Sequence, residues 1–126
     1  MSENKEYLVQ PQENGNILIS QEVIASVAAL AVREVEGVYG LSMTAGFDIS
    51  EILGKKNLRK GIKVVFQDDE VEISCNLIVK MGAEVMTVAK NVQESIVNEV
   101  TSITGCRPAR VNVNVCGVAV PKTAAK

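Results

Sequence analysis

Residues Val85 to Val118, VMTVAKNVQESIVNEVTSITGCRPARVNVNVCGV, decide the fold of this chain. Apolar residues recur at helical spacing up to Thr104, which predicts an amphipathic helix that stops at Gly105. Residues 111–118 then alternate valine with asparagine or cysteine, the pattern of a strand with one apolar and one polar face. A helix followed directly by such a strand predicts a helix packed on a sheet, and neither element carries a catalytic group.

The first half of the chain supplies one more long helix, with a short strand on each side. Residues 17–19 are a strand candidate, and Ser20 is placed to cap the helix that follows. Apolar residues and alanines continue at helical spacing, and Gly37 is the predicted stop. Residues 38–42 form the next strand candidate.

A hairpin is predicted from residues 62–67 and 71–76, with a tight turn at Asp68-Asp69. A longer turn stays open, because Asp-Asp lacks the glycine that two-residue turns favour. One register keeps every apolar side chain on one face, and a slip by one residue would put core residues in water. That register pairs Phe66 with Val71, Val64 with Ile73 and Ile62 with Cys75. The order β-α-β-β-β-α-β predicts an α+β fold in two layers, with two long helices packed on one face of a largely antiparallel sheet.

Length and composition indicate a single domain. The chain has 126 residues, of which 47% are hydrophobic and 3% aromatic, enough for one compact, β-branched core. We expect residues 1–15 to form a flexible polar tail, residues 16–120 the domain, and residues 121–126 a short C-terminal tail.

The N-terminus lacks the apolar segment of a signal peptide, and no apolar run is long enough to span a bilayer. We therefore expect no direct membrane insertion.

The composition argues against an enzyme. The chain contains no histidine, the side chain most used for acid–base chemistry near neutral pH and for metal binding. No nucleophile has a base at a useful spacing. The net charge of −2 gives no general attraction to nucleic acid. We predict no enzymatic activity, no catalytic residues, no metal site, no cofactor and no nucleic-acid partner.

The three cysteines, Cys75, Cys106 and Cys116, are odd in number and lack CxxC spacing. This usage fits a reducing cytoplasm better than a secreted disulfide framework. Cys75 lies in phase with Ile73 and Leu77 and is predicted to be a small core residue.

Two surfaces are candidates for interaction. The first is the basic cluster, which is either a solvated loop or a contact for lipid head groups, RNA backbone or an acidic partner. Its members are Lys55, Lys56, Arg59, Lys60 and Lys63. The second is the polar face of the sheet, whose apolar residues are either scattered or a binding patch. The candidate interaction residues on this face are Val65, Ile78, Asn112, Asn114 and Val118.

Several stretches together resemble the alkaline shock protein family, the envelope-stress proteins of Gram-positive bacteria. They are Ile17–Ile24, Glu34–Val38, Lys60–Val64, Val88–Glu94, Thr104-Gly105 and Val111–Val118, and they span nearly the whole domain in the expected order. Two departures, Met86 where many relatives carry proline and Cys116 where they carry a polar residue, leave the branch of the family open.

The resemblance implies a cytoplasmic protein without catalytic activity, peripheral to the inner face of the membrane and held there through a membrane-anchored partner. With the exposed sheet, it leads us to expect a self-associating scaffold or adaptor in envelope homeostasis. Two alternatives stay open: regulation of fatty-acid synthesis through acetyl-CoA carboxylase, which a related branch suggests, and a small RNA-binding domain.

Overall fold

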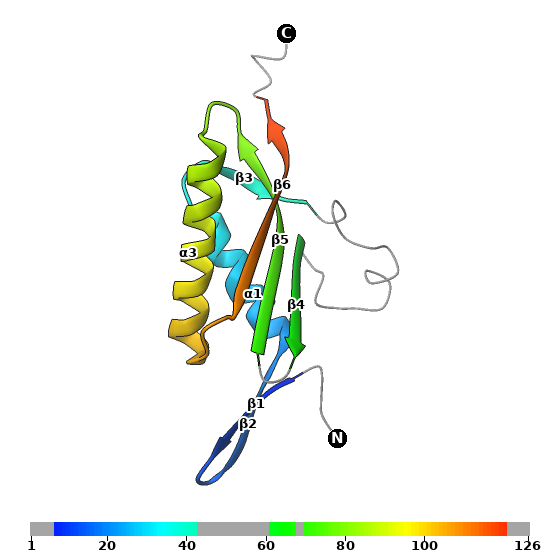
Figure 1. Cartoon of the computed structure of the whole chain (residues 1–126), viewed down its shortest axis with the longest axis vertical. Coiled ribbons are helices and arrows are strands. Elements are labelled where there is room, and N and C mark those ends of the chain that lie inside the picture. Colours follow the sequence, from blue (N-terminus) through cyan, green and yellow to red (C-terminus); the bar gives the residue numbers. More distant parts are fainter. Residues whose placement is uncertain (1–6, 43–60, 68–69, 121–126) are drawn as a thin grey trace, which may run out of the picture.

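The computed structural model describes residues 7–42, 61–67 and 70–120. Its elements are β1 (Tyr7–Gln12), β2 (Gly15–Ser20), α1 (Gln21–Arg33), β3 (Val38–Leu41), β4 (Ile62–Gln67), β5 (Glu70–Lys80), α3 (Val85–Thr104) and β6 (Arg110–Ala119). Both helices lie on one side of a four-stranded sheet, and the β1–β2 hairpin projects from one end of the molecule (Figure 1). The predicted two-layer α+β architecture is confirmed.

Strand β5 is the centre of the main sheet. Strands β3 and β4 pair with it antiparallel, whereas β6 pairs with it in parallel. Because β6 spans β5 from Glu72 to Lys80, it occupies one edge alone, and β4 and β3 follow one another along the other edge. The predicted hairpin register is confirmed at all three pairs. The turn residues Asp68 and Asp69 lie outside the described residues.

Strands β3 and β4 resemble one strand interrupted at the level of Asn76. Ser42, which follows β3, donates its backbone N–H to the carbonyl of Asn76 at 3.0 Å. Gly61, which precedes β4, has a φ of +79°, and a Cβ there would lie 2.5 Å from the carbonyl oxygen of Ser42. The chain therefore leaves and rejoins the sheet at one point of its edge, and only glycine fits there without strain.

The core fills the space between the helices and the covered face of the sheet. Alanines 25, 28, 29 and 31 of α1 are all buried, which lets the two helices approach closely. The hydroxyl of Ser95 on α3 donates to the carbonyl of Ala31 at 3.0 Å. Four members of the predicted α3 stripe, Val88, Val92, Ile96 and Val100, are buried, while Val85 and Ile103 at the helix ends are exposed.

Three of the four predicted helix limits are confirmed. The Ser20 hydroxyl caps α1 by accepting the N–H of Val23 at 3.2 Å, and α3 runs from Val85 to a left-handed Gly105. The predicted stop at Gly37 is wrong, because α1 ends at Arg33. Gly37 instead turns the chain toward β3 with a φ of +96°, where a Cβ would lie 2.7 Å from Cγ2 of Val88. This glycine allows the turn to pass close to α3.

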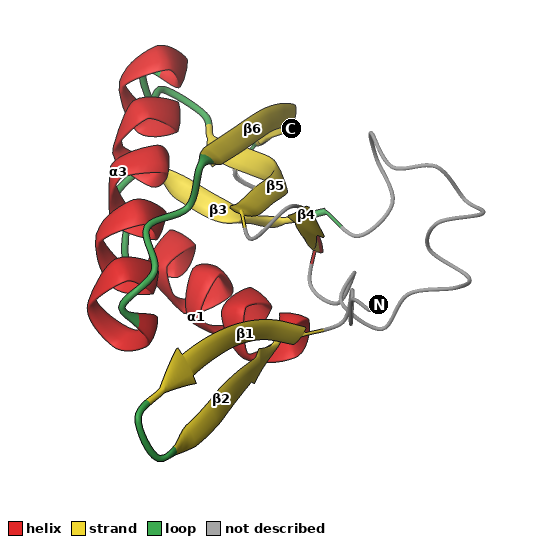
Figure 2. Cartoon of the chain, turned by 60° about the horizontal axis from the view of Figure 1, so that its bottom comes forward, coloured by secondary structure: helices red, strands yellow, loops and turns green. Residues whose placement is uncertain are grey.

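Strand β1 was not predicted from the sequence. Residues 7–12, which were expected to belong to a polar tail, pair antiparallel with β2, from Tyr7 with Ser20 to Gln12 with Gly15. Leu8 anchors the base of this hairpin in the core with 4% of its surface exposed. The remainder stands apart from the main sheet (Figure 2). The limits of the domain and its two tails stay a prediction.

Candidate interaction surface

The face of the main sheet opposite the two helices carries rows of polar side chains. The amide Nδ2 of Asn112 donates to Oε2 of Glu72 at 2.9 Å and to Oγ of Ser74 at 3.3 Å. The amide Nδ2 of Asn114 donates to Oδ1 of Asn76 at 3.0 Å. These bonds join β6 to β5, so the predicted polar face has at least a structural role.

Asn76 is fully buried although it lies on this polar face. It sits on the central strand, between Asn114 on one side and the point where the chain leaves β3 on the other. A buried amide requires hydrogen-bond partners, and Asn114 supplies one of them. The centre of the polar face is therefore closed to solvent at this position.

The predicted interaction residues do not all come together. Lys55, Lys56, Arg59 and Lys60 lie outside the described residues. Lys63 pairs with Ser74 and Val65 with Glu72, so both lie on the polar face with Asn112 and Asn114. Ile78 is on the same face, but about 20 Å from the level of Val65 at 3.3 Å per residue. Val65 and Ile78 therefore do not form one apolar patch.

An irregularity in β6 moves Val118 off the polar face. The register shifts after the pair Leu77–Val115, so that Gly117 pairs with Ile78 and Val118 with Val79. Paired residues of neighbouring strands share a face. Val118 therefore shares the face of the core residue Val79, and its predicted place on the polar face is wrong. Strict alternation could not reveal the extra residue, Cys116.

Strand β6 is an edge strand, since in the described part of the chain it pairs with β5 alone. Gln93 of α3 covers its start by donating from Nε2 to the carbonyl of Val111 at 3.0 Å. From Val111 to Val120 the strand has neither a charge nor a proline. Those are the features that usually prevent an exposed edge from pairing with another chain.

A groove separates the second half of α3 from the start of β6, with a cavity volume of about 530 Å³. Its lining residues are Gln93, Glu94, Val97, Asn98, Arg107, Pro108, Ala109, Arg110 and Val111. The charged side chains are one carboxylate and two guanidinium groups, and no nucleophile is placed beside a base. This lining suits polar contacts rather than an acid–base reaction.

The cysteines are unpaired, and Cys75 is chemically protected. It is fully buried, as predicted. Burial raises the pKa of its thiol to about 12, and the nearby Cys116 contributes a smaller part of this increase. Because the thiolate is the reactive form, Cys75 is inert at neutral pH. Cys106 is half-buried and accepts a hydrogen bond from Gln10 of the hairpin, and Cys116 is exposed.

Across residues 7–42, 61–67 and 70–120, no cluster of side chains is arranged to hold a metal ion. In the same part of the chain, neither helix is both long and apolar enough to cross a membrane.

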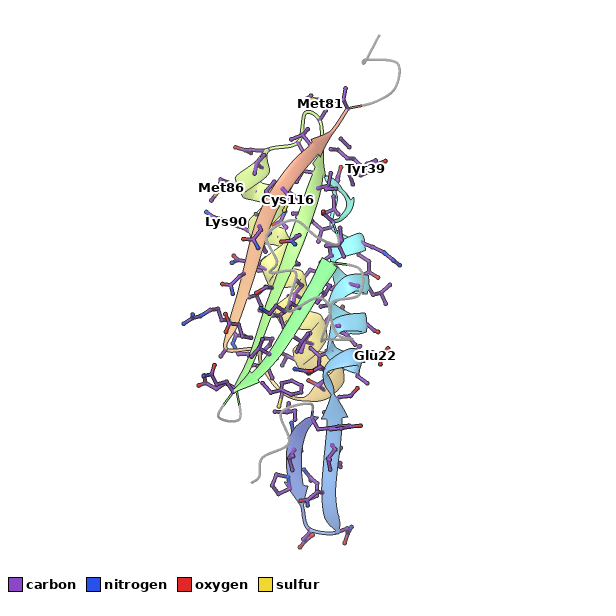
Figure 3. All side chains as sticks on the ribbon, turned by 90° about the vertical axis from the view of Figure 1, so that its right-hand side faces the viewer. Glu22, Tyr39, Met81, Met86, Lys90 and Cys116 are labelled. Atoms are coloured by element: carbon purple, nitrogen blue, oxygen red, sulfur yellow. The ribbon has the colours of Figure 1, made fainter. Side chains whose placement is uncertain are left out.

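The gathering of exposed apolar side chains could not be seen in the sequence. Of the fourteen large apolar side chains that are exposed in the described part of the chain, nine form two groups, and the other five are Val23, Leu30, Val85, Ile103 and Val115. At one end of the molecule is the hairpin patch, made of Tyr7, Val9, Ile17 and Leu18. At the other end is the far-end patch, made of Tyr39, Met81, Met86, Val118 and Val120. The labelled Tyr39, Met81 and Met86 lie toward the end opposite the hairpin (Figure 3).

Fold and surface thus define a small α+β domain with an open edge strand and two apolar ends, whose described residues assemble no catalytic constellation. Residues 9–120 match the model of the alkaline shock protein 23 family, described as having a cell envelope-related function. The chain belongs to this family.

Curated relatives come from Gram-positive bacteria. The chain is 34% identical to the uncharacterized protein YloU of Bacillus subtilis over 84% of this chain and 90% of the relative. It is 32% identical to YqhY of the same organism, over 82% and 77% of the two chains. It is 28% identical to Spy1614 of Streptococcus pyogenes, over 86% and 91%. No solved structure matches the chain.

Proposed function

We propose that this protein is a non-enzymatic scaffold that self-associates at the cytoplasmic face of the cell membrane and holds partner proteins there. The family supplies the link to the cell envelope. A separate membrane-anchored protein then supplies the attachment. Assembly is the molecular activity of the domain, and attachment to the anchored partner localises it.

The observation that carries the proposal is the β6 edge. A ten-residue strand with one open side presents backbone N–H and C=O groups that a strand of another chain can pair with. Monomeric domains block such edges with charges, prolines or covering elements. Here Gln93 guards only the start of the strand, at Val111.

Asn114→Lys tests this proposal. Asn114 is exposed and projects from the polar face of β6, so a lysine there adds charge beside the edge. The substitution also removes the hydrogen bond to the buried amide of Asn76, so Asn114→Ala, which loses the same bond without adding charge, is measured beside it. We expect the Asn114→Lys variant to fold. Its dissociation constant for self-association should be about tenfold higher than that of the wild type, because a charged side chain on an edge strand disfavours pairing with another strand. Sedimentation velocity over a concentration series measures the change.

The matched control is Ser26→Lys, at an exposed position on α1 that does not line the groove beside β6. It adds the same charge and should leave assembly unchanged. Equal assembly of the wild type and Asn114→Lys would contradict a role for β6.

A further inference from the structure

We infer that the groove between α3 and β6 is a docking site for a short, extended peptide segment with acidic side chains, contributed by a partner protein. The inference rests on the proposed role as a scaffold that holds partner proteins, and it adds the chemistry of the segment that is held. The groove reaches only the start of β6, at Val111, so it does not occupy the rest of the strand edge proposed for self-assembly.

The groove carries two guanidinium groups that have no ion-pair partner in the described part of the chain. Arg107 and Arg110 both line it, and both are exposed. Glu72 pairs with Arg110 in the register of β5 and β6, but its Oε2 atom accepts Nδ2 of Asn112 at 2.9 Å. Two arginines against the single carboxylate of Glu94 give the lining a net positive charge, although the whole chain has a net charge of −2. The groove therefore offers a local attraction for carboxylates that the rest of the chain does not.

The loop that carries these arginines is held at both ends. It joins the end of α3 to the start of β6 (Figure 1). On the helix side, the hydroxyl of Thr104 accepts the N–H of Cys106 at 3.1 Å. On the strand side, the N–H of Ala109 donates to the carbonyl of Val71 at 2.8 Å, which attaches the loop to β5. A loop fixed in this way presents its charged groups at set positions, which lowers the entropic cost of binding.

The remaining lining suits a peptide backbone with small apolar side chains. Gln93 donates from Nε2 to the carbonyl of Val111 at 3.0 Å, which fixes this amide and leaves its Oε1 atom to accept a peptide N–H. The exposed amide of Asn98 supplies a second polar contact, and Val97 and Pro108 supply apolar ones. From Gln93 to Asn98 the helix side of the groove runs for about 7.5 Å, the length of two to three extended residues.

The same lining favours an acidic peptide over a nucleic acid. None of the residues that line the groove is aromatic, so a base would find no ring on which to stack. A nucleic acid also carries a phosphate at every step, whereas a peptide can place a neutral residue beside Glu94. Arginine binds carboxylates through paired hydrogen bonds, which suits glutamate or aspartate side chains of the partner.

Fluorescence anisotropy of two labelled peptides tests the inference. The probe is a short fluorescein-labelled peptide of alternating glutamate and alanine, and the counter-probe has lysine in place of glutamate. The glutamate peptide should bind to the wild type with saturation, and the lysine peptide should not bind. Added salt should weaken the binding, because both arginines are exposed to solvent.

Four variants locate the binding in the groove. Arg107→Gln and Arg110→Gln should each raise the dissociation constant of the glutamate peptide about threefold, and the double variant about tenfold, as expected for exposed ion pairs. Glu94→Gln should lower it about threefold, because it removes the repelling carboxylate. Arg33→Gln is the matched control, an exposed arginine on α1 outside the groove, and should bind the peptide as the wild type does.

Sedimentation velocity and circular dichroism of the same proteins separate this inference from self-association. All four variants should be folded and should assemble as the wild type does. A wild type that binds the peptide but stays a single chain would contradict self-association and leave the docking site intact.

Four results would overturn the docking site. The first is an assembling wild type that does not bind the glutamate peptide at high micromolar concentration. The second is binding that is unchanged in the double arginine variant, and the third is an equal loss in Arg33→Gln, which would indicate non-specific attraction. The fourth is a single-stranded RNA oligonucleotide that binds more tightly than the peptide and depends on the same arginines, since the groove would then be a nucleic-acid interface.

Discussion

Two threonine hydroxyls near the end of α3 differ in their hydrogen bonding. The hydroxyl of Thr104 donates to the carbonyl of Val100 at 2.7 Å and accepts the N–H of Cys106 at 3.1 Å. The Oγ1 atom of Thr101 is buried and finds no partner among the described residues. A buried polar atom without a partner retains the cost of losing its water.

Thr101→Val should therefore stabilise the protein, by about 1 kcal/mol. The shape and branching of the side chain are kept while the unsatisfied hydroxyl is removed. Thr104→Val is the matched control and should destabilise by about 1 kcal/mol, because it leaves a backbone N–H without its acceptor. Urea denaturation measures both, and the expectation fails if Thr101→Val is the more destabilising of the two.

Cys75 should make stability depend on alkaline pH. Its thiol pKa rises on folding from 9.0 to about 12, mainly because the side chain is buried. The folded state thus binds this proton more tightly than the unfolded state, and the resulting stabilisation is complete below pH 9 and is lost as pH rises toward about 12.

Cys75→Val removes this titration. Between about pH 9 and 11 the free energy of unfolding should fall more steeply in the wild type than in the variant, by at most about 1.4 kcal/mol per pH unit. Urea denaturation at a series of pH values compares the two slopes. Parallel curves would show that Cys75 does not contribute.

At the scale of elements, the joint between β3 and β4 brings the backbone of Gly61 close to that of Ser42. A Cβ at Gly61 meets the carbonyl oxygen of Ser42 at 2.5 Å, whereas a Cβ at Gly82 has no atom within 4 Å. Both glycines have positive φ, at +79° and +93°. The two positions therefore separate backbone strain from steric overlap.

Gly61→Ala should destabilise the protein by about 3 kcal/mol, since it adds an overlap with backbone to the strain of a positive φ. Gly82→Ala should cost about 1 kcal/mol from strain alone. Thermal denaturation of both variants checks the difference. Similar losses in the two would mean that the joint relaxes freely.

Much of this element order follows from sequence, because local patterns determine it. The β4–β5 register depends on one side of each strand being apolar, so Phe66 and Val71 could be paired from sequence. The end of α1 could not be predicted from sequence, because Val35 continues the helical spacing of apolar residues although the chain already turns at Glu34. Strand β1 was missed because residues 1–15 were assigned to a polar tail, although Asn14-Gly15 is also a hairpin signal.

The interaction surface was less predictable than the fold. Alternation placed Asn112 and Asn114 on the polar face, but an inserted residue such as Cys116 leaves no trace in a valine-rich pattern. The two apolar patches combine residues from distant segments, as Tyr39 and Met86 show, and only the packed structure reveals which of them stay exposed.

For the whole molecule, the proposed scaffold reaches the membrane through a partner. The protein should float with membranes from cells and should not bind liposomes of neutral lipid when purified. Attachment through a partner requires no insertion of this chain into the bilayer. Flotation in a density gradient tests both statements, and tight binding to neutral liposomes without another protein would contradict them.

The central claim is that the domain assembles with itself. Sedimentation equilibrium of the purified wild type, from low to high micromolar concentration, tests it most directly. We predict a weight-average mass that rises with concentration well above the 13.5 kDa of one chain. A mass that stays at one chain up to high micromolar concentration would contradict the account.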